Sequence, residues 1–184
     1  MKVTKENPEI IRFIYRQEPG DDHYGSCLWA FFDIDTGHGM MSIQSDCGNY
    51  AYRWPEKGWD FLYMLSYASK SYLLSKLCGS PRMFDEKGTI SRIEEYMADI
   101  EADEQTKAEA LEKLKKTFQD YCLDDAPEIA QFLVDEWNDE FDLEIDCAWE
   151  LVSTVYETHQ KKIVDIFLEH IVPEIEKIVA KGKV

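Results

Sequence analysis

The first third of the chain alternates apolar and polar positions with a period of two, which is typical of β-strands. Residues 9–16 (EIIRFIYR) alternate in this way, while residues 26–35 (SCLWAFFDID) are apolar at both even and odd positions. The second pattern favours a middle strand that is covered on both faces. The glycine-containing turn at 35–39 (DTGHG) then predicts a hairpin to an antiparallel strand that begins at residue 40.

The third predicted strand changes register within its own length. Met41 and Ile43 lie on one face of a regular strand, whereas three later aromatic residues would lie on the opposite face: Tyr50, Tyr52 and Trp54. An inserted residue brings both sets to the same side, because the side-chain period of a strand is two. We therefore predict a bulge or tight kink at 46–49 (DCGN) within a three-stranded sheet.

Helical spacing begins near residue 59. Phe61, Leu65, Ala68 and Tyr72 form one apolar stripe, which predicts a helix to about residue 77 that covers the sheet. The aromatic side chains of Tyr50, Tyr52 and Trp54 either pack against this helix or form a platform that binds a partner.

Residues 89–182 have helical patterns throughout. Capping boxes begin at Ser91 and Thr106, and Pro173 kinks or restarts the last helix. A helix over 126–141 is expected to turn four residues inward: Ile129, Phe132, Leu133 and Trp137. A further stripe over 145–156 predicts another helix.

These patterns predict an α+β fold. A three-stranded antiparallel sheet covered by a helix occupies residues 1–80, and an acidic α-helical bundle occupies residues 89–184. The two parts are expected to pack as one unit, with a weak boundary near residues 79–88.

Charge distinguishes the two halves. The 184 residues contain 37 Asp and Glu against 20 Lys and Arg, a formal charge of −17. Residues 1–88 carry −2 and residues 89–184 carry −15. This balance disfavours direct binding to nucleic acid, whose phosphates require Lys and Arg. It favours a basic protein partner, or a surface that only keeps the protein soluble.

The candidate partner-binding residues lie between Lys116 and Lys161, where 13 carboxylates occur and no Lys or Arg offsets them locally. The residues assigned to partner binding are Asp135, Glu136, Asp139, Glu140, Asp142, Glu144 and Asp146, together with the aromatic residues Tyr50, Tyr52 and Trp54. Such an acidic surface can imitate nucleic-acid phosphate and occupy a basic groove, or it can be an ordinary solvated helix face.

Signals for catalysis or cofactors are weak. There is no Walker loop, GxGxxG, GxSxG or HExxH motif, and residues 138–150 fail the EF-hand template. Glu169 and His170 are neighbours on a helix and are expected on different faces. The five cysteines form no CxxC pair, so we predict reduced thiols, no metal, no cofactor and no enzymatic activity.

Targeting signals are also lacking. No run of 18 apolar residues occurs, and the N-terminus (MKVTKENPEI) has no apolar signal segment. The expected location is cytoplasmic, with no membrane partner.

The string MSIQSDCGNYAYRW, followed by an aromatic-rich helix and YLLSKLCG, resembles small proteins encoded in bacteriophage and prophage genomes that carry an SDxGxYxYxW strand. The resemblance covers about residues 26–78. It implies a bacterial host and a stoichiometric inhibitor similar to acidic anti-CRISPR proteins, which would bind the Lys- and Arg-rich surface of a host nucleic-acid-binding defence protein. The alternatives are a toxin-immunity protein, a metal-dependent hydrolase that uses the same carboxylates, and an oligomeric structural protein.

Overall fold

The chain divides into two compact units, the second inserted within the first. The first unit combines residues 1–80 with residues 158–184, and the second unit is residues 81–157. The C-terminal segment thus packs with the sheet, whereas the predicted division at residue 89 places it with the acidic helices. The computed structural model describes residues 9–22, 24–121, 123–124 and 126–182.

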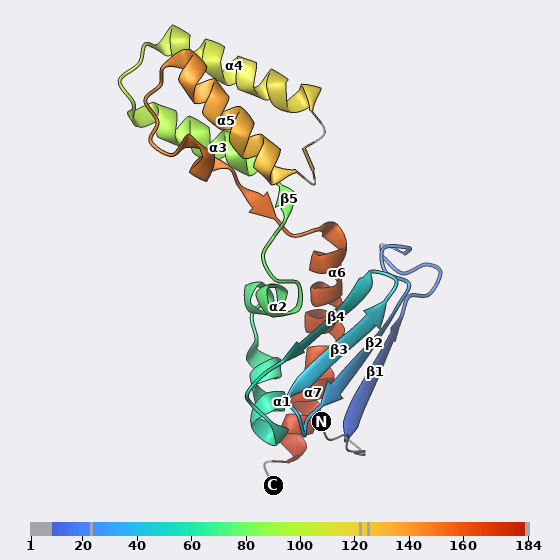
Figure 1. The fold of residues 1–184 in the computed structure, drawn as a ribbon. Helices are drawn as coiled ribbons and strands as arrows, with labels where there is room; N and C mark the ends of the chain where they lie inside the picture. The colour runs from blue at the N-terminus through green and yellow to red at the C-terminus, as the bar shows by residue number, and fades with distance from the viewer. Residues whose placement is uncertain (1–8, 23, 122, 125, 183–184) are drawn as a thin grey trace, which may run out of the picture. The chain divides into compact units, whose positions relative to one another are not determined.

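A four-stranded antiparallel sheet forms the first unit's framework, so the α+β class is confirmed and the strand count of three is wrong (Figure 1). The strands lie in the order β1 (Ile10–Arg16), β2 (Trp29–Asp35), β3 (Met40–Ser45) and β4 (Gly48–Arg53).

The extra strand arises because residues 46–47 form a hairpin turn instead of a bulge. Ser45 pairs with Gly48 across the turn, and its hydroxyl donates to the Gly48 carbonyl at 2.7 Å. Gly48 has φ +112°, which an L-residue rarely adopts. Ile43 pairs directly with Tyr50. The two halves of the stretch therefore share one face, as expected, but a chain reversal achieves this.

Within the described residues, only one face of the sheet is covered. Phe32 and Ile34 on the inner face of β2 are fully buried, whereas Trp29 on the outer face is 38% exposed and Ile14 of β1 is 57% exposed. The prediction that β2 is covered on both sides is therefore wrong.

Helices from both chain segments of the first unit cover the inner face (Figure 1). Phe32 of β2 contacts Phe167, with ring centroids 5.8 Å apart. The predicted helix over 59–77 is broken, because Ala68 is extended and Ser69 caps a second helix by accepting from the Tyr72 N–H. The helices are α1 (Gly58–Tyr67), α2 (Lys70–Leu77), α6 (Thr158–Ile166), the π-helix η2 (Phe167–Ile171) and α7 (Val172–Lys181).

The second unit is a three-helix layer closed by a two-strand ladder. Its elements are β5 (Met83–Phe84), α3 (Glu86–Asp99), α4 (Glu104–Asp120), α5 (Pro127–Phe141), the 3-10 helix η1 (Ala148–Leu151) and β6 (Thr154–Val155). Trp137 of α5 is buried and donates from Nε1 to the Ala110 carbonyl of α4 at 2.7 Å. Asp85 and Asp103 cap α3 and α4, so the predicted capping boxes at Ser91 and Thr106 are wrong.

The predicted helix over 145–156 is also absent. This stretch contains only the 3-10 turn η1 and strand β6, which pairs with β5. Cys147 has φ +53°, a left-handed conformation that interrupts a right-handed helix.

Helices that could span a bilayer are not found: none in the described part of the chain is long and apolar enough.

Candidate functional site

Almost all of the net charge belongs to the second unit. Residues 81–157 contain 23 Asp and Glu against seven Lys and Arg, a formal charge of −16. The first unit contains 14 against 13, a formal charge of −1. The division of the fold therefore separates a nearly neutral unit from a strongly anionic one.

All seven carboxylates that the sequence assigns to partner binding are exposed in the second unit. Four lie on α5, and the others lie in the segment that follows it. In chain order they are Asp135, Glu136, Asp139, Glu140, Asp142, Glu144 and Asp146.

The outer side of α5 also presents apolar residues. Phe132 is 59% exposed and Ile129 is 48% exposed, so the prediction that they turn inward is wrong. The buried side of α5 consists of Ala130, Leu133, Val134 and Trp137. Helical spacing places Phe132 in the middle of the opposite side, next to Asp135 at i+3 and Glu136 at i+4, with Asp139 two turns further along the same side. We call Ile129, Phe132 and the seven carboxylates the acidic face.

The segment after α5 is held with its carboxylates outward. Asp142 and Glu144 have φ of 48° and 53°, which non-glycine residues seldom adopt. Leu143 and Ile145 between them are 5% and 3% exposed. This alternation directs the apolar side chains into the core and leaves the acidic ones in solvent.

Tertiary packing supplies a cation that the linear sequence lacks near α5. Lys113 of α4 forms an ion pair with Glu140 and lies 5.8 Å from the centroid of the Phe141 ring. Glu140 is therefore partly neutralised. No such ion pair is found for Asp135 or Asp139 among the described residues.

The aromatic residues in β4 and directly after it pack within the first unit. Trp54 is 2% exposed, lies 5.5 Å from the Phe61 ring and donates from Nε1 to the Tyr72 hydroxyl at 3.0 Å. Its assignment to partner binding is therefore wrong, because burial removes it from any partner. Tyr50 and Tyr52 are half-buried: Tyr50 donates to the Cys47 carbonyl, and Tyr52 packs edge-on against Trp54.

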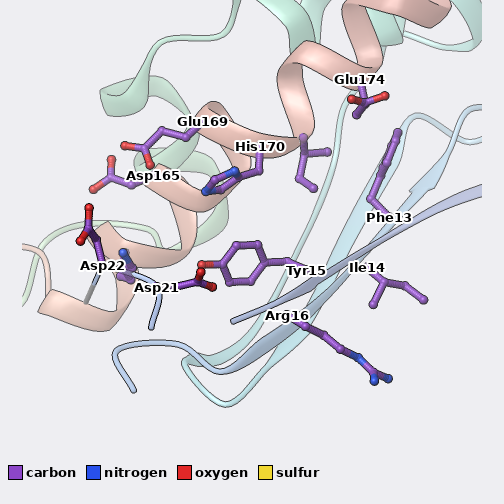
Figure 2. Close-up of a pocket in the computed structure, with 12 residues that line it drawn as sticks. Phe13, Ile14, Tyr15, Arg16, Asp21, Asp22, Asp165, Glu169, His170 and Glu174 are labelled. Carbon is purple, nitrogen blue, oxygen red and sulfur yellow. The ribbon is translucent and has the colours of Figure 1, made fainter. Parts of the chain in front are cut away.

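A groove of about 900 Å³ lies in the first unit between β1 and the α6–α7 helices (Figure 2). Tyr15 lines one side, with its ring 5.2 Å from that of His170. The carboxylates that line the groove include Asp165 and Glu169. Lys70 forms an ion pair with Asp165 at 2.6 Å. Burial raises the pKa of Tyr15, and nearby anionic groups add to the shift. The groove has the chemistry to accept a cationic group beside an aromatic ring.

The π-helix brings Glu169 and His170 to the same groove, contrary to the expectation that they face apart. Pro173 follows closely and has no N–H to donate to the Glu169 carbonyl, so the regular α-helical bond is missing here. Pro173 was the sequence signal for this irregularity.

One of three comparisons with known proteins identifies a family. The model of the phage family Phage_phiTE_072 matches residues 1–177. No curated protein and no solved structure gives a significant match. Because the family model spans both units almost completely, the chain belongs to this phage family.

Proposed function

We propose that this phage protein is a stoichiometric inhibitor, of the anti-CRISPR kind, that binds the basic surface of a host nucleic-acid-binding defence protein. The observation that carries the proposal is the formal charge of −16 on the second unit. The acidic face is the part of that unit expected to meet the partner.

Electrostatic attraction allows such a surface to act on its partner at a distance and to associate with it quickly. Clustered carboxylates attract a Lys- and Arg-rich groove over about one Debye length, roughly 8–10 Å at physiological salt. Attraction of this kind raises the rate of association and weakens as the salt concentration rises. The nearly neutral first unit contributes little to it.

Phe132 supplies apolar contact area, which the charged residues do not. Aromatic residues surrounded by a polar rim are frequent hot spots of protein interfaces, because they bury a large apolar area with few rotatable bonds. Phe132 is 59% exposed, and Asp135 and Glu136 are its neighbours at i+3 and i+4 on α5. We therefore expect the partner to present an apolar depression bordered by Lys and Arg.

The hydrolase alternative requires carboxylate oxygens that converge on a metal ion. Within the described ranges, the one converging group of His, Cys, Asp or Glu is Cys27, Asp46 and Cys47, and none of the acidic-face residues belongs to it. A toxin-immunity protein would use the acidic face in the same way, and it differs only in its partner.

Capture from a bacterial host lysate on the immobilised full-length protein tests the proposal. We expect nucleic-acid-binding proteins to be retained at low salt, released at high salt and displaced by heparin. The double variant Asp135→Lys, Asp139→Lys should lose at least nine-tenths of this capture.

A matched control distinguishes the effect of the acidic face from the effect of total charge. The double variant Glu9→Lys, Glu176→Lys makes the same change in charge at exposed positions of the first unit, and it should keep the capture. Equal losses in the two double variants would contradict a binding role for the acidic face. Salt-independent retention by both would contradict the electrostatic mechanism.

A further inference from the structure

Two thiols and a carboxylate converge at the end of the sheet in the first unit. Cys27 lies two residues before β2, and Asp46 and Cys47 form the β3–β4 turn. One ligand atom from each of the three residues lies within 4.8 Å of the other two. Cys27 and Cys47 are 1% and 4% exposed, while Asp46 reaches solvent.

We propose that Cys27, Cys47 and Asp46 form a binding site for a thiophilic divalent metal ion such as Zn²⁺. Tetrahedral zinc with Zn–S of about 2.3 Å and Zn–O of about 2.1 Å separates sulfur atoms by about 3.8 Å and sulfur from oxygen by about 3.6 Å. The Cys27 Sγ to Asp46 Oδ1 distance is 3.4 Å. The observed convergence therefore needs only small side-chain rotations to surround an ion.

The carboxylate of this set is already oriented by the backbone. The N–H groups of Leu28 and Trp29 donate to Asp46 at 2.9 and 3.4 Å. Hydrogen bonds of this kind fix metal ligands and are part of built metal sites.

Ser26 provides a second, independent observation. Its hydroxyl oxygen is buried and is the single such side-chain atom without a hydrogen-bond partner in the described chain. The carbonyl of the same residue lies 3.1 Å from Cys47 Sγ. A buried polar atom without a partner costs stability, and this one belongs to a residue whose backbone carbonyl accepts from the Cys47 thiol.

Metal binding here is a ligand exchange without oxidation or reduction. The two thiols each lose a proton to solvent, two S–metal bonds form, and Asp46 adds a third bond. Three anionic ligands around a divalent cation leave a net charge of −1, and a water molecule completes the coordination. The same residues also form a hydrogen-bond network without metal, so the experiment must separate the two roles.

Cobalt titration of the reduced, chelator-treated full-length protein provides that test. Co²⁺ bound to thiolates gives a near-ultraviolet charge-transfer band whose intensity depends on the number of thiolates. We expect saturation at one ion per chain, loss of the band on adding Zn²⁺, and a rise in Tm with the metal. Cys27→Ser and Cys47→Ser should each remove most of the band, while Cys147→Ser in the second unit should retain it.

Asp46→Asn addresses variants that fail to fold, because the amide oxygen can still accept from the Leu28 N–H, the shorter of the two backbone hydrogen bonds. This variant should keep the circular dichroism spectrum and bind Co²⁺ at least tenfold more weakly. The proposal is overturned if the wild-type protein gives no thiolate band, if Cys27→Ser gives the same band, or if Asp46→Asn binds with unchanged affinity. A Cys27–Cys47 disulfide in the isolated protein, with no metal binding after reduction, also overturns it.

Discussion

Asn138 is joined to Ile145 by two hydrogen bonds: its Nδ2 donates to the Ile145 carbonyl at 3.2 Å, and its Oδ1 accepts from the Ile145 N–H at 3.1 Å. One side chain at the end of α5 thereby satisfies both backbone groups of a buried residue seven positions later. This clamp keeps Ile145 in the core and leaves Glu144 and Asp146 on the surface.

Removing the clamp should loosen the segment after α5. We expect Asn138→Ala to lower the free energy of unfolding by about 1–3 kcal/mol, because two buried backbone groups lose their partner. Hydrogen exchange should show lost protection at the Ile145 amide while the α4 amides stay protected. Gln119→Ala, at an exposed position of α4, is the control and should leave both unchanged. Unchanged exchange at Ile145 in the Asn138 variant would refute the clamp.

Two phenylalanines of the second unit should respond oppositely to truncation. Phe118 is 2% exposed, so Phe118→Ala should cost about 3–5 kcal/mol of stability through a core cavity. Phe132 is 59% exposed, so Phe132→Ala should change stability by no more than about 0.5 kcal/mol. Urea unfolding measures both values. A large loss for Phe132→Ala would show that this ring faces inward after all.

A tight backbone approach makes Gly39 irreplaceable in the β2–β3 turn. It has φ +64°, and an added Cβ would lie 2.0 Å from the Glu56 carbonyl oxygen. We expect Gly39→Ala to destabilise the protein by roughly 2–4 kcal/mol. Gly58 has a similar φ of +56° with open space around its Cβ position, so Gly58→Ala should cost only about 1 kcal/mol. Equal changes in Tm for the two variants would mean that strain in φ, and not the contact, dominates.

The Asp103 cap of α4 should make stability depend on pH in the acid range. Hydrogen bonds from the side chain and the backbone N–H of Thr106 lower the pKa of Asp103 below its usual value. A lowered folded-state pKa stabilises the protein above the unfolded pKa, near 3.8, and this contribution disappears as the pH falls through the folded value. The Tm difference between the wild type and Asp103→Asn should therefore be constant near neutral pH and shrink below about pH 4. A difference that does not vary with pH would contradict the role of the ionised cap.

Local patterns along the chain identified the framework well. The predicted helix over 126–141 appears as α5 (Pro127–Phe141), and the turn at 35–39 joins β2 to β3 as expected. These features depend on residues close in sequence, where periodicity and glycine conformation act directly. The pattern could not choose between a bulge and a hairpin at 46–49, because both bring Ile43 and Tyr50 to one face.

The sequence pattern predicted burial wrongly where packing between elements decides which side chains face the core. Phe132 and Leu133 are adjacent, and the apolar stretch of α5 is wide enough for either to face inward. Packing in the core of the second unit buries Leu133, which is 9% exposed, and leaves Phe132 in solvent. Sequence spacing likewise gave no reason to join Cys27 with Cys47, which the closure of two hairpins brings together.

Residue type and short spacing were enough to define the strand and helix periods, the excess of carboxylates after residue 116 and the lack of Walker, GxGxxG, GxSxG and HExxH motifs. The tertiary structure alone decided that residues 158–184 complete the first unit and that the charge of −16 collects in the second. It also decided that two thiols and a carboxylate meet at one turn. The physical reason is that contacts between distant residues depend on how whole elements pack, and the local pattern of a segment does not contain that information.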